Sequence, residues 1–494
     1  MSGPDELLES LRRLERDSRP LEPGGARRRD LRKAVIGSSE RFLRRVRTLD
    51  AYVETPDKGA GLLELPISDD GLPLTEAIEL FEREVVRPGG HPSSGGYLAY
   101  IPGGALYHSA LGDFLAAVSN KYAGVFFAGP GLVRMENLLV RWVADLVGYP
   151  AGAGGNIASG GSIATLTAIA AARDAHGIRS ADVPRAVVYL TSQAHHCIEK
   201  ALRLAGLGEA QVRQVPVDGD YRMRPDALAQ AISADRAQGL APWLVVAAAG
   251  TTDVGAVDPL DDIGEIAARE RCWFHVDAAY GGFFMLTDHG KRVLRGIGRS
   301  DSVVLDPHKS LFLPFGIGMV LVRDVGALAA SNAYSGHYMQ DALADPGEIS
   351  PADLSPELSK HFRALRMWLP LIVLGTKPFR AALDEKLLLA RYFRREVSKL
   401  GFETGPEPEL SIVTFRWAPR GATLEEANET NRRIVEAVRR DGRIFLSSTE
   451  LDGRFTLRMA ALAFRTHRRT IDLALTVLQE VLSTVVPERA EAVP

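Results

Sequence analysis

The chain has 494 residues, of which 46% are hydrophobic and 24% are charged. This length and composition predict a folded protein of two or three domains with a large core. Lysine plus arginine (59) nearly balance aspartate plus glutamate (62), so the net charge of -3 argues against nucleic acid or an anionic membrane as the main partner.

Three features bear on the compartment. The first residues, MSGPDELLESL, are acidic and lack the apolar core of an export signal. No uncharged apolar run reaches the length that a bilayer span needs. The two cysteines, Cys197 and Cys272, lie far apart in the sequence, so we expect no disulfide framework and a reducing compartment. Together these features predict a cytoplasmic protein.

Residues 1–90 have a helical pattern that is broken by RPLEPGGA and VETPDKGAG. The arginine-rich stretch 24–48 also carries apolar residues at helical spacing, and we interpret it as a packing helix with a solvated basic face. The segment therefore predicts an extension that packs on another surface, rather than a domain with its own core.

Residues 91–375 contain short apolar runs that alternate with amphipathic stretches. The runs are AVVYLT (186–191), WLVVAAAG (243–250), CWFHVDAAY (272–280), DSVVLDPHK (301–309) and GMVLVRD (318–324). Continuous apolar strands separated by helices predict an α/β fold, with a mostly parallel sheet covered on both faces. Ligands of such sheets bind at the carboxyl ends of the strands. A helix is predicted over 358–375.

Residues 376–494 have a different pattern. The runs LSIVTFRWA, RIFLSST and RFTLRMAAL are typical of strands, and helices are predicted over 424–440 and 469–482. This segment predicts a smaller α+β domain.

Polar side chains follow several of the predicted strands at the point where each one ends. Lys309 comes after SVVL, Asp277 after CWFHV, Thr251 and Thr252 after VVAAAG, and His195 after VVYLTSQA. Because the carboxyl ends of parallel strands meet at one edge of a sheet, we expect these residues to lie close together.

Lys309 stands between two apolar segments. In dry surroundings the pKa of a lysine falls, and the neutral amine is a nucleophile that forms a Schiff base with a carbonyl. A lysine at a strand end can equally be a snorkelling or salt-bridged residue, so Lys309 gains its functional interpretation from its neighbours.

Asp277 ends a strand in HVDAAYGG, where small residues leave room for a flat ring. A buried carboxylate there needs a cationic partner, and a protonated pyridine nitrogen is one; the alternative is an aspartate that caps the following turn. A metal site at His195, His196 and Cys197 is not expected, because no further histidine or cysteine cluster supplies ligands. Stacking on an aromatic cofactor suits His195 better.

The stretch ASGGSIATLTAIAAAR (158–173) places small residues before an alanine-rich helix. Free backbone N–H groups and the helix dipole there favour an anion such as phosphate. A turn with a serine cap is the simpler alternative. The stretch lacks the G-x-G-x-x-G spacing of dinucleotide folds.

Together these motifs resemble the pyridoxal-phosphate-dependent group II amino acid decarboxylases, the family of aromatic-L-amino-acid and glutamate decarboxylases. Motifs in family order run from HPSSGGYLAYIPGG through SGGSIATLTAI, SQAHHCIEKA, GTTDVGAVDPLDDI, HVDAAYGG, DPHKSLFLPFGIGMVLVRD and HFRALRMW to STELDGRFTLRMAALAFRTHRRTID. The resemblance implies fold type I, the aspartate aminotransferase-like fold. It implies a large domain (91–375) with a seven-stranded sheet, a small domain (376–494), and an amino-terminal segment (1–90) that embraces the partner in a homodimer.

The resemblance also implies roles for individual residues. Lys309 forms the internal aldimine, Asp277 pairs with the pyridine nitrogen, and His195 and Ala279 flank the ring. The implied phosphate-side residues are Gly160, Gly161, Ser162, Thr252, Asp306 and His308. Aromatic decarboxylases of animals usually have asparagine at the position of Asp306.

The implied substrate pocket lies at the subunit interface, with a contribution from the neighbouring subunit. Its residues are Tyr100, Ile101, Pro102, Phe126 and Phe127. Their aromatic side chains suit an aromatic amino acid, although they could equally be core packing. We therefore place aromatic amino acids ahead of glutamate or cysteine sulfinate as substrates.

The implied reaction is decarboxylation of an L-amino acid to its amine and CO₂ through the Lys309 aldimine and a quinonoid. A mobile loop is expected near 338–357, but 341–359 lack the tyrosine that protonates Cα in aromatic decarboxylases, with Pro351 at about its place. His337, Tyr338 or water could be the donor, the loop could align differently, or oxygen could react to give an aldehyde. Further departures are Ile163, where relatives have glutamate, and Ser310, where they have an aromatic residue.

Two other classes stay open. A non-catalytic dimer that binds the cofactor is one, but the presence of Lys309, Asp277 and His195 argues against it. An aminotransferase is the other; the histidine directly before Lys309 and the stacking His195 favour a decarboxylase.

Overall fold

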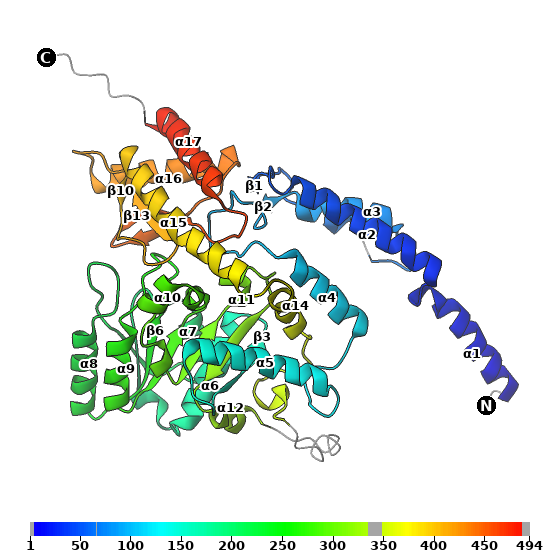
Figure 1. The fold of residues 1–494 in the computed structure, drawn as a ribbon, viewed down its shortest axis with the longest axis horizontal. Helices are drawn as coiled ribbons and strands as arrows, with labels where there is room; N and C mark the ends of the chain where they lie inside the picture. The colour runs from blue at the N-terminus through cyan, green and yellow to red at the C-terminus, as the bar shows by residue number, and fades with distance from the viewer. Residues whose placement is uncertain (1–3, 66, 334–347, 487–494) are drawn as a thin grey trace.

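The computed structural model describes residues 4–65, 67–333 and 348–486. Its centre is a seven-stranded sheet of strand order β3-β9-β8-β7-β6-β4-β5 (Figure 1). The strands are β3 (Gly154–Ala158), β4 (Ala186–Leu190), β5 (Gln211–Gln214), β6 (Ala241–Ala248), β7 (Trp273–Asp277), β8 (Ser302–Leu305) and β9 (Gly318–Val322).

The sheet is mostly parallel, which confirms the predicted α/β architecture. The pairs β4–β5, β4–β6, β6–β7 and β7–β8 are parallel, whereas β9 is antiparallel to both β8 and β3. Strands β4, β8 and β9 are buried along their whole length, as expected for branched apolar residues covered on both faces.

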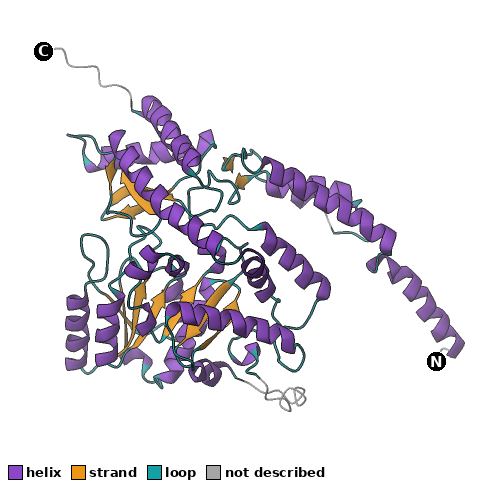
Figure 2. Cartoon of the chain, viewed as in Figure 1, coloured by secondary structure: helices purple, strands orange, loops and turns teal. Residues whose placement is uncertain are grey.

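Helices cover both faces of this sheet (Figure 2). Helix α6 (Gly161–Ala175) lies on β3, β8 and β9, next to α7 (Cys197–Leu204) and α12 (Val325–Asn332). On the other face α5 (Pro130–Val147) contacts β3, and α8 (Pro225–Ala237) and α9 (Leu260–Arg269) contact β6. The short helices α10 (Asp288–Val293) and α11 (Pro307–Ser310) follow β7 and β8.

The carboxyl-terminal segment forms a second layer. Its antiparallel sheet has the order β10-β11-β13-β12, from β10 (Glu403–Thr404), β11 (Ile412–Arg416), β12 (Ser447–Leu451) and β13 (Arg454–Ala460). Helices α15 (Lys377–Lys399), α16 (Leu424–Asp441) and α17 (Arg468–Val485) share one core with this sheet. The predicted α+β character is thus observed, while the domain boundaries at residues 90 and 375 stay predictions.

The amino-terminal segment extends away from the body as an arm (Figure 1). It contains α1 (Pro4–Ser18), α2 (Gly25–Arg45), α3 (Leu74–Phe81) and a two-stranded pair of β1 (Tyr52–Val53) with β2 (Gly89–Gly90). The arginine-rich stretch is helical as predicted, but α2 buries no residue, and Val35 and Ile36 are 49% and 50% exposed. Its apolar side is therefore only partly covered within this protomer, where α2 contacts α3.

The helix predicted over 358–375 begins later than expected. Helix α14 spans Ala364–Leu374 and packs beside α4 (Tyr107–Ser119). Residues just before it turn inward instead, because Lys360 enters a buried ion pair with Glu136 and Arg363 pairs with Glu357 at 2.9 Å. Among the described helices, none is both long and apolar enough to cross a membrane.

Candidate active site

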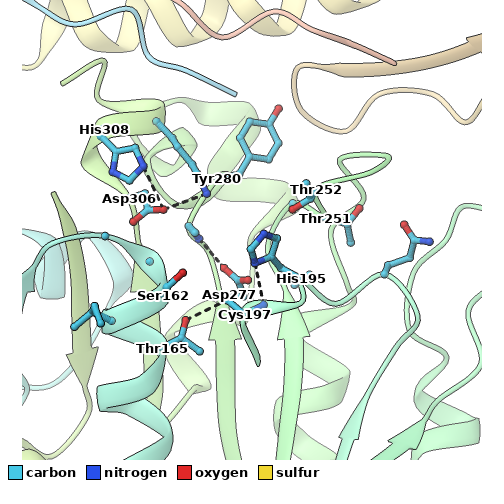
Figure 3. A pocket seen from close by; sticks show the side chains of 18 of the residues that line it. Ser162, Thr165, His195, Cys197, Thr251, Thr252, Asp277, Tyr280, Asp306 and His308 are labelled. Atoms are coloured by element: carbon cyan, nitrogen blue, oxygen red, sulfur yellow. Dashed lines mark hydrogen bonds and ion pairs between the residues drawn. The ribbon is translucent and has the colours of Figure 1, made fainter. Parts of the chain in front are cut away.

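A cavity of about 370 Å³ opens at the carboxyl ends of the strands (Figure 3). Every residue that the sequence analysis assigned to the cofactor lines it. These residues are Gly160, Gly161, Ser162, His195, Thr252, Asp277, Ala279, Asp306, His308 and Lys309. Residues that lie up to 149 positions apart thus meet because parallel strands end at one edge.

Lys309 and Asp306 are fixed by the turn that follows β8. Asp306 comes directly after the strand, Pro307 begins α11, and the Lys309 N–H donates to the Asp306 carbonyl at 2.9 Å. The Lys309 Nζ then lies 3.1 Å from Asp306 Oδ2. Gly103 packs against this turn, where a Cβ would come within 2.5 Å of the Lys309 carbonyl oxygen. Only a glycine allows that approach.

The charge state of Lys309 differs from the sequence-based expectation. Burial lowers the pKa of its ammonium, but the carboxylates of Asp306 and Asp277 raise it by more, and the pKa ends above its ordinary value. The predicted fall in the Lys309 pKa was wrong, because that prediction took account of burial but not of the two nearby carboxylates. Lys309 is therefore an ammonium in the cofactor-free protein.

Asp277 ends β7 and is held by the turn after it. Its Oδ1 accepts the Ala279 N–H at 3.1 Å, and its carbonyl accepts the Ala249 N–H at 2.8 Å, which ties the ends of β6 and β7 together. The predicted turn-capping contact is therefore present. One capping bond leaves acceptor capacity on the carboxylate for a cation in the cavity.

His195 lies in the turn between β4 and α7. Its Nδ1 accepts the Cys197 N–H at 3.3 Å, so the proton of the neutral ring is on Nε2. Burial lowers the pKa of His195 by more than the nearby Asp277 raises it. The ring is thus uncharged at neutral pH, which suits stacking on a flat, electron-poor partner.

The amino terminus of α6 forms an anion cradle. Gly161 is its first residue, with Ser162 next, and both line the cavity across from His308. The Asp306 carboxylate lies against the cradle, where a Cβ on Gly161 would come within 2.8 Å of Asp306 Oδ2. The free N–H groups at this end favour a phosphate.

Sequence reasoning missed some of the lining residues. Gln193 is 9% exposed and its Oε1 has no partner among the described residues, while Thr165 contacts Cys197 Sγ at 3.8 Å. Gln193 stands two residues before His195 in the same turn, which is the signal that could have found it. Ile163, one of the departures from the family, also lines the cavity.

The residues expected to line the substrate pocket do not border this cavity within the protomer. Tyr100 and Phe127 are 60% and 55% exposed, whereas Ile101, Pro102 and Phe126 are buried. Their role stays a prediction. The expected donors His337 and Tyr338, and the first part of the expected loop at 338–357, lie outside the described residues.

Comparison with known proteins decides the family. The conserved domain of pyridoxal-dependent decarboxylases matches residues 56–418, which is more than half of the chain. The chain belongs to the pyridoxal-dependent decarboxylase family. An aromatic-L-amino-acid decarboxylase of Bacillus atrophaeus is 34% identical over 403 residues, covering 81% of this chain and 84% of the relative. A tryptophan decarboxylase of Oryza sativa is 31% identical, covering 80% and 82%.

Solved structures agree with this decarboxylase fold. The Oryza sativa tryptophan decarboxylase with pyridoxal phosphate and tryptamine superposes with a TM-score of 0.88 at 26% identity, covering 94% of this chain and 99% of the other. The predicted fold type and family are thereby confirmed. The protein is a pyridoxal-phosphate-dependent amino acid decarboxylase, a carboxy-lyase.

The residues of this decarboxylase fit the cofactor. A helix terminus with Gly161 and Ser162 offers N–H donors to a phosphate, and Lys309 offers an amine to an aldehyde. Asp277 keeps acceptor capacity for a ring nitrogen. Asp306 Oδ1 is buried without a hydrogen-bond partner among the described residues, so this acceptor oxygen is free for a donor group of a bound molecule.

Proposed function

We propose that this decarboxylase acts on L-amino acids with aromatic side chains and releases CO₂ and the corresponding amine. The observation that carries the proposal is one cavity that joins Lys309, Asp277 and the uncharged His195. Relatives named as aromatic-L-amino-acid, tryptophan and tyrosine decarboxylases support the substrate class.

The residues of this chain have distinct tasks in the proposed reaction. When bound, pyridoxal phosphate supplies an electron-poor ring that accepts the electron pair left by departing CO₂. Lys309 would hold the cofactor through its Nζ amine, and the substrate amine would take the place of Nζ during turnover. Asp277 stabilises positive charge at the ring nitrogen, and His195 presents a flat neutral face to the ring.

The aromatic preference is supported by the exposed rings near the subunit surface. Phe127 and Tyr100 are each more than half exposed within the protomer, which leaves their rings free to contact a substrate or a second subunit. We propose that Tyr100, Ile101, Pro102, Phe126 and Phe127 line the substrate pocket where two subunits meet. A dicarboxylic substrate is less well supported, because none of these five residues carries a positive charge.

The test is an assay of the purified holoenzyme against a panel of aromatic and acidic amino acids. CO₂, amine, aldehyde and oxygen uptake are recorded together, with and without air. We expect amine and CO₂ in equal amounts from an aromatic substrate, without oxygen uptake. CO₂ from glutamate alone would contradict the substrate class, and keto acid without CO₂ would contradict decarboxylation.

The aldehyde-forming branch is a second candidate. Residues 341–359 contain no tyrosine, and a phenylacetaldehyde synthase of Arabidopsis thaliana is 29% identical over 405 residues. If this branch operates, the same assay yields aldehyde with oxygen uptake and no amine.

We also propose that the protein is a homodimer whose active site lies at the subunit interface. Apolar side chains on the outer faces of α4 and α14 form a surface that we call the α4/α14 patch. Its members are Leu111, Phe114, Leu115, Val118, Ile372 and Val373, exposed by 42 to 70%. The two helices pack side by side, and the arm leaves the body close to α4 (Figure 1). A large apolar surface of this kind is typical of a subunit contact.

The dimer predicts the behaviour of one substitution. Phe114→Glu places a charge in the α4/α14 patch and is expected to raise the dimer dissociation constant at least about tenfold. Sedimentation velocity over a dilution series measures it. Leu424→Glu, at an exposed leucine that begins α16, is the matched control. An unchanged dissociation constant for Phe114→Glu would place the interface elsewhere.

We propose a cytoplasmic location because both cysteines are free thiols. Cys197 and Cys272 are both free and buried, as befits a protein kept in a reducing compartment.

A further inference from the structure

Residues 93–104 form a segment that carries three of the residues proposed to line the substrate pocket, Tyr100, Ile101 and Pro102. The backbone of Tyr100 has a φ of 53°, in the left-handed region that residues other than glycine rarely adopt. Its side chain is 60% exposed. Contacts on either side of Tyr100 are therefore needed to hold this conformation.

One end of the segment is joined to the turn that carries the nucleophile. The Gly103 N–H donates to the His308 carbonyl at 3.2 Å, and the Gly103 carbonyl accepts the Phe464 N–H at 3.1 Å. A Cβ on Gly103 would come within 2.5 Å of the Lys309 carbonyl oxygen. The three pocket residues therefore stand one to three positions before a residue that contacts both the Lys309 turn and the carboxyl-terminal segment.

Arg465, which follows β13, contacts both ends of segment 93–104 at once. Its Nη1 donates to the Ser93 carbonyl at 3.3 Å and also to the Gly104 carbonyl. The guanidinium carbon lies 4.3 Å from the centroid of the Phe464 ring, which supports the guanidinium from one side. No carboxylate pairs with Arg465 among the described residues, so its charge acts on these two carbonyl oxygens. Arg465 thus closes the segment into a loop.

The residue after Arg465 adds to the same attachment. Thr466 Oγ1 donates to the Gly95 carbonyl at 2.7 Å, and the Thr466 carbonyl accepts a hydrogen bond from Lys386 Nζ on α15. Thr466 and Lys386 are both fully buried. A Cβ on Gly95 would come within 2.6 Å of the Arg465 carbonyl oxygen, so the two backbones are in close contact. Segment 93–104 is therefore held from the carboxyl-terminal segment along its length.

We propose that Arg465 is a positioning residue for substrate binding, because it closes segment 93–104 and so holds residues 100–102 where the substrate side chain binds. Arg465 is not among the residues that line the described cofactor cavity. Without its hydrogen bonds the segment would occupy further conformations, and only the fraction in the competent one would bind substrate. The groups that contact the cofactor would stay in place. This inference rests on the proposed substrate pocket and is independent of the aromatic preference.

Substitution of Arg465 tests this role. Arg465→Met removes both donated hydrogen bonds and keeps an apolar stem against the Phe464 ring. We expect its KM to rise at least about tenfold, with kcat within about threefold of the wild type, for any amino acid that the wild type decarboxylates. Arg465→Lys keeps the charge but has no planar fork, so its KM should be intermediate.

A second arginine provides the matched control. Arg185 Nε and Nη2 both donate to the Gly239 carbonyl, at 3.1 and 2.7 Å, and neither residue lines the described cavity. Arg185→Met therefore removes a comparable attachment of a loop elsewhere in the protein. Its KM and kcat should equal those of the wild type.

Amide hydrogen exchange gives a readout that needs no substrate. In Arg465→Met holoenzyme, peptides that cover 93–106 should exchange faster than in the wild type, because the hydrogen bonds donated by the Leu98 and Gly103 N–H groups would open more often. Peptides that cover the buried strand β4 should exchange at the wild-type rate. The dissociation constant of pyridoxal phosphate should also be unchanged.

Three results would overturn the proposal. An unchanged KM for Arg465→Met, with or without a lower denaturation midpoint, would make Arg465 merely structural. A higher KM without faster exchange in 93–106 would mean that Arg465 does not act by holding the segment. Weaker binding of pyridoxal phosphate with a matching fall in kcat would mean that Arg465 supports the Lys309 turn instead.

A milder variant keeps the test open if Arg465→Met does not fold. Thr466→Val removes the hydrogen bond to the Gly95 carbonyl and retains the size of the buried side chain. We expect its KM to rise about threefold with kcat unchanged. A folded Thr466→Val enzyme with the wild-type KM would then overturn the proposal.

Tyr100→Ala separates this inference from the pocket assignment on which it rests. If Tyr100→Ala raises KM and Arg465→Met does not, the pocket assignment stands and the role of Arg465 is wrong. If Tyr100→Ala leaves KM unchanged, the pocket assignment fails and this inference fails with it. The assay uses any amino acid that the wild type decarboxylates, so neither outcome depends on the aromatic preference.

Discussion

Replacing Lys309 with alanine is expected to lower the rate of CO₂ release by at least about 10³-fold. The substitution removes the amine that holds the cofactor and exchanges it for the substrate, and no other lysine lines the described cavity. The cofactor would bind without a covalent link, so its dissociation constant should rise and the imine absorbance should be absent. Activity and absorbance are both measured on protein incubated with excess cofactor.

A small amine provides the control for this prediction. Methylamine in the buffer can form an imine with the cofactor and should restore part of the activity of Lys309→Ala, because it fills the space that the side chain leaves. Lys291→Ala, at a surface lysine with 59% of its side chain exposed, should behave as the wild type. A Lys309→Ala protein that retains activity and imine absorbance without added amine would assign the nucleophile to another residue.

Much of this site follows from sequence because its residues stand at strand ends. Runs such as SVVL and WLVVAA contain branched and aromatic residues that are stable as buried strands with few alternatives. Once those strands are parallel, their carboxyl ends lie at one edge, and Lys309, Asp277 and His195 must converge. That argument needs only the order of the strands, and the structure places all three in one cavity.

The strands that sequence reasoning did not find have a different origin. Strand β3 (GGNIA) has two glycines and gains its extended conformation from pairing with β9. Strand β5 (QVRQ) is polar and lies at the edge, where it pairs with β4 alone. Both owe their form to a neighbour rather than to their own residues, so a local pattern does not reveal them.

The charge of Lys309 was mispredicted for a related reason. Burial of a lysine follows from its apolar flanks, but the position of Asp306 Oδ2 relative to Nζ depends on a helical turn and two close glycines. The sequence separation of three residues between Asp306 and Lys309 does not determine which way their side chains point. Distances of this kind decide the sign of a pKa shift, and they come only from the folded chain.

Lys360 is the second residue whose importance appears only in the structure. It lies 224 positions from Glu136, yet Nζ and Oε1 are 2.7 Å apart and both side chains are buried. Glu136 on α5 also accepts the Ile157 N–H, and Lys360 donates to Asn156 Oδ1 at 3.3 Å. The pair therefore joins α5, β3 and the segment 348–360.

Lys360→Met is expected to destabilise the protein by about 3–5 kcal/mol, because it leaves a buried carboxylate without its cation. The double variant Lys360→Met with Glu136→Gln should cost less than Lys360→Met alone, since the amide still accepts the Ile157 N–H and carries no charge. Chemical denaturation at matched protein concentration measures both. Lys399→Met removes an exposed lysine whose Nζ lies 2.8 Å from Glu396, and should leave the midpoint unchanged.

We expect Lys360→Met also to disturb the loop that carries Phe126, which is proposed to line the substrate pocket. Segment 348–360 contacts the neighbouring loop through three hydrogen bonds. Ser350 Oγ accepts the Phe126 N–H at 3.0 Å, the Ala352 N–H donates to the Gly124 carbonyl at 2.9 Å, and the Tyr122 hydroxyl donates to the Leu358 carbonyl at 3.0 Å. Lys360→Met loosens the far end of this segment, so we expect a higher KM for the aromatic substrate with a smaller change in kcat. If Lys360→Met is destabilised but its KM is unchanged, these contacts hold Phe126 in place without Lys360. If the denaturation midpoint of Lys360→Met is unchanged, water or Asn156 compensates the charge of Glu136.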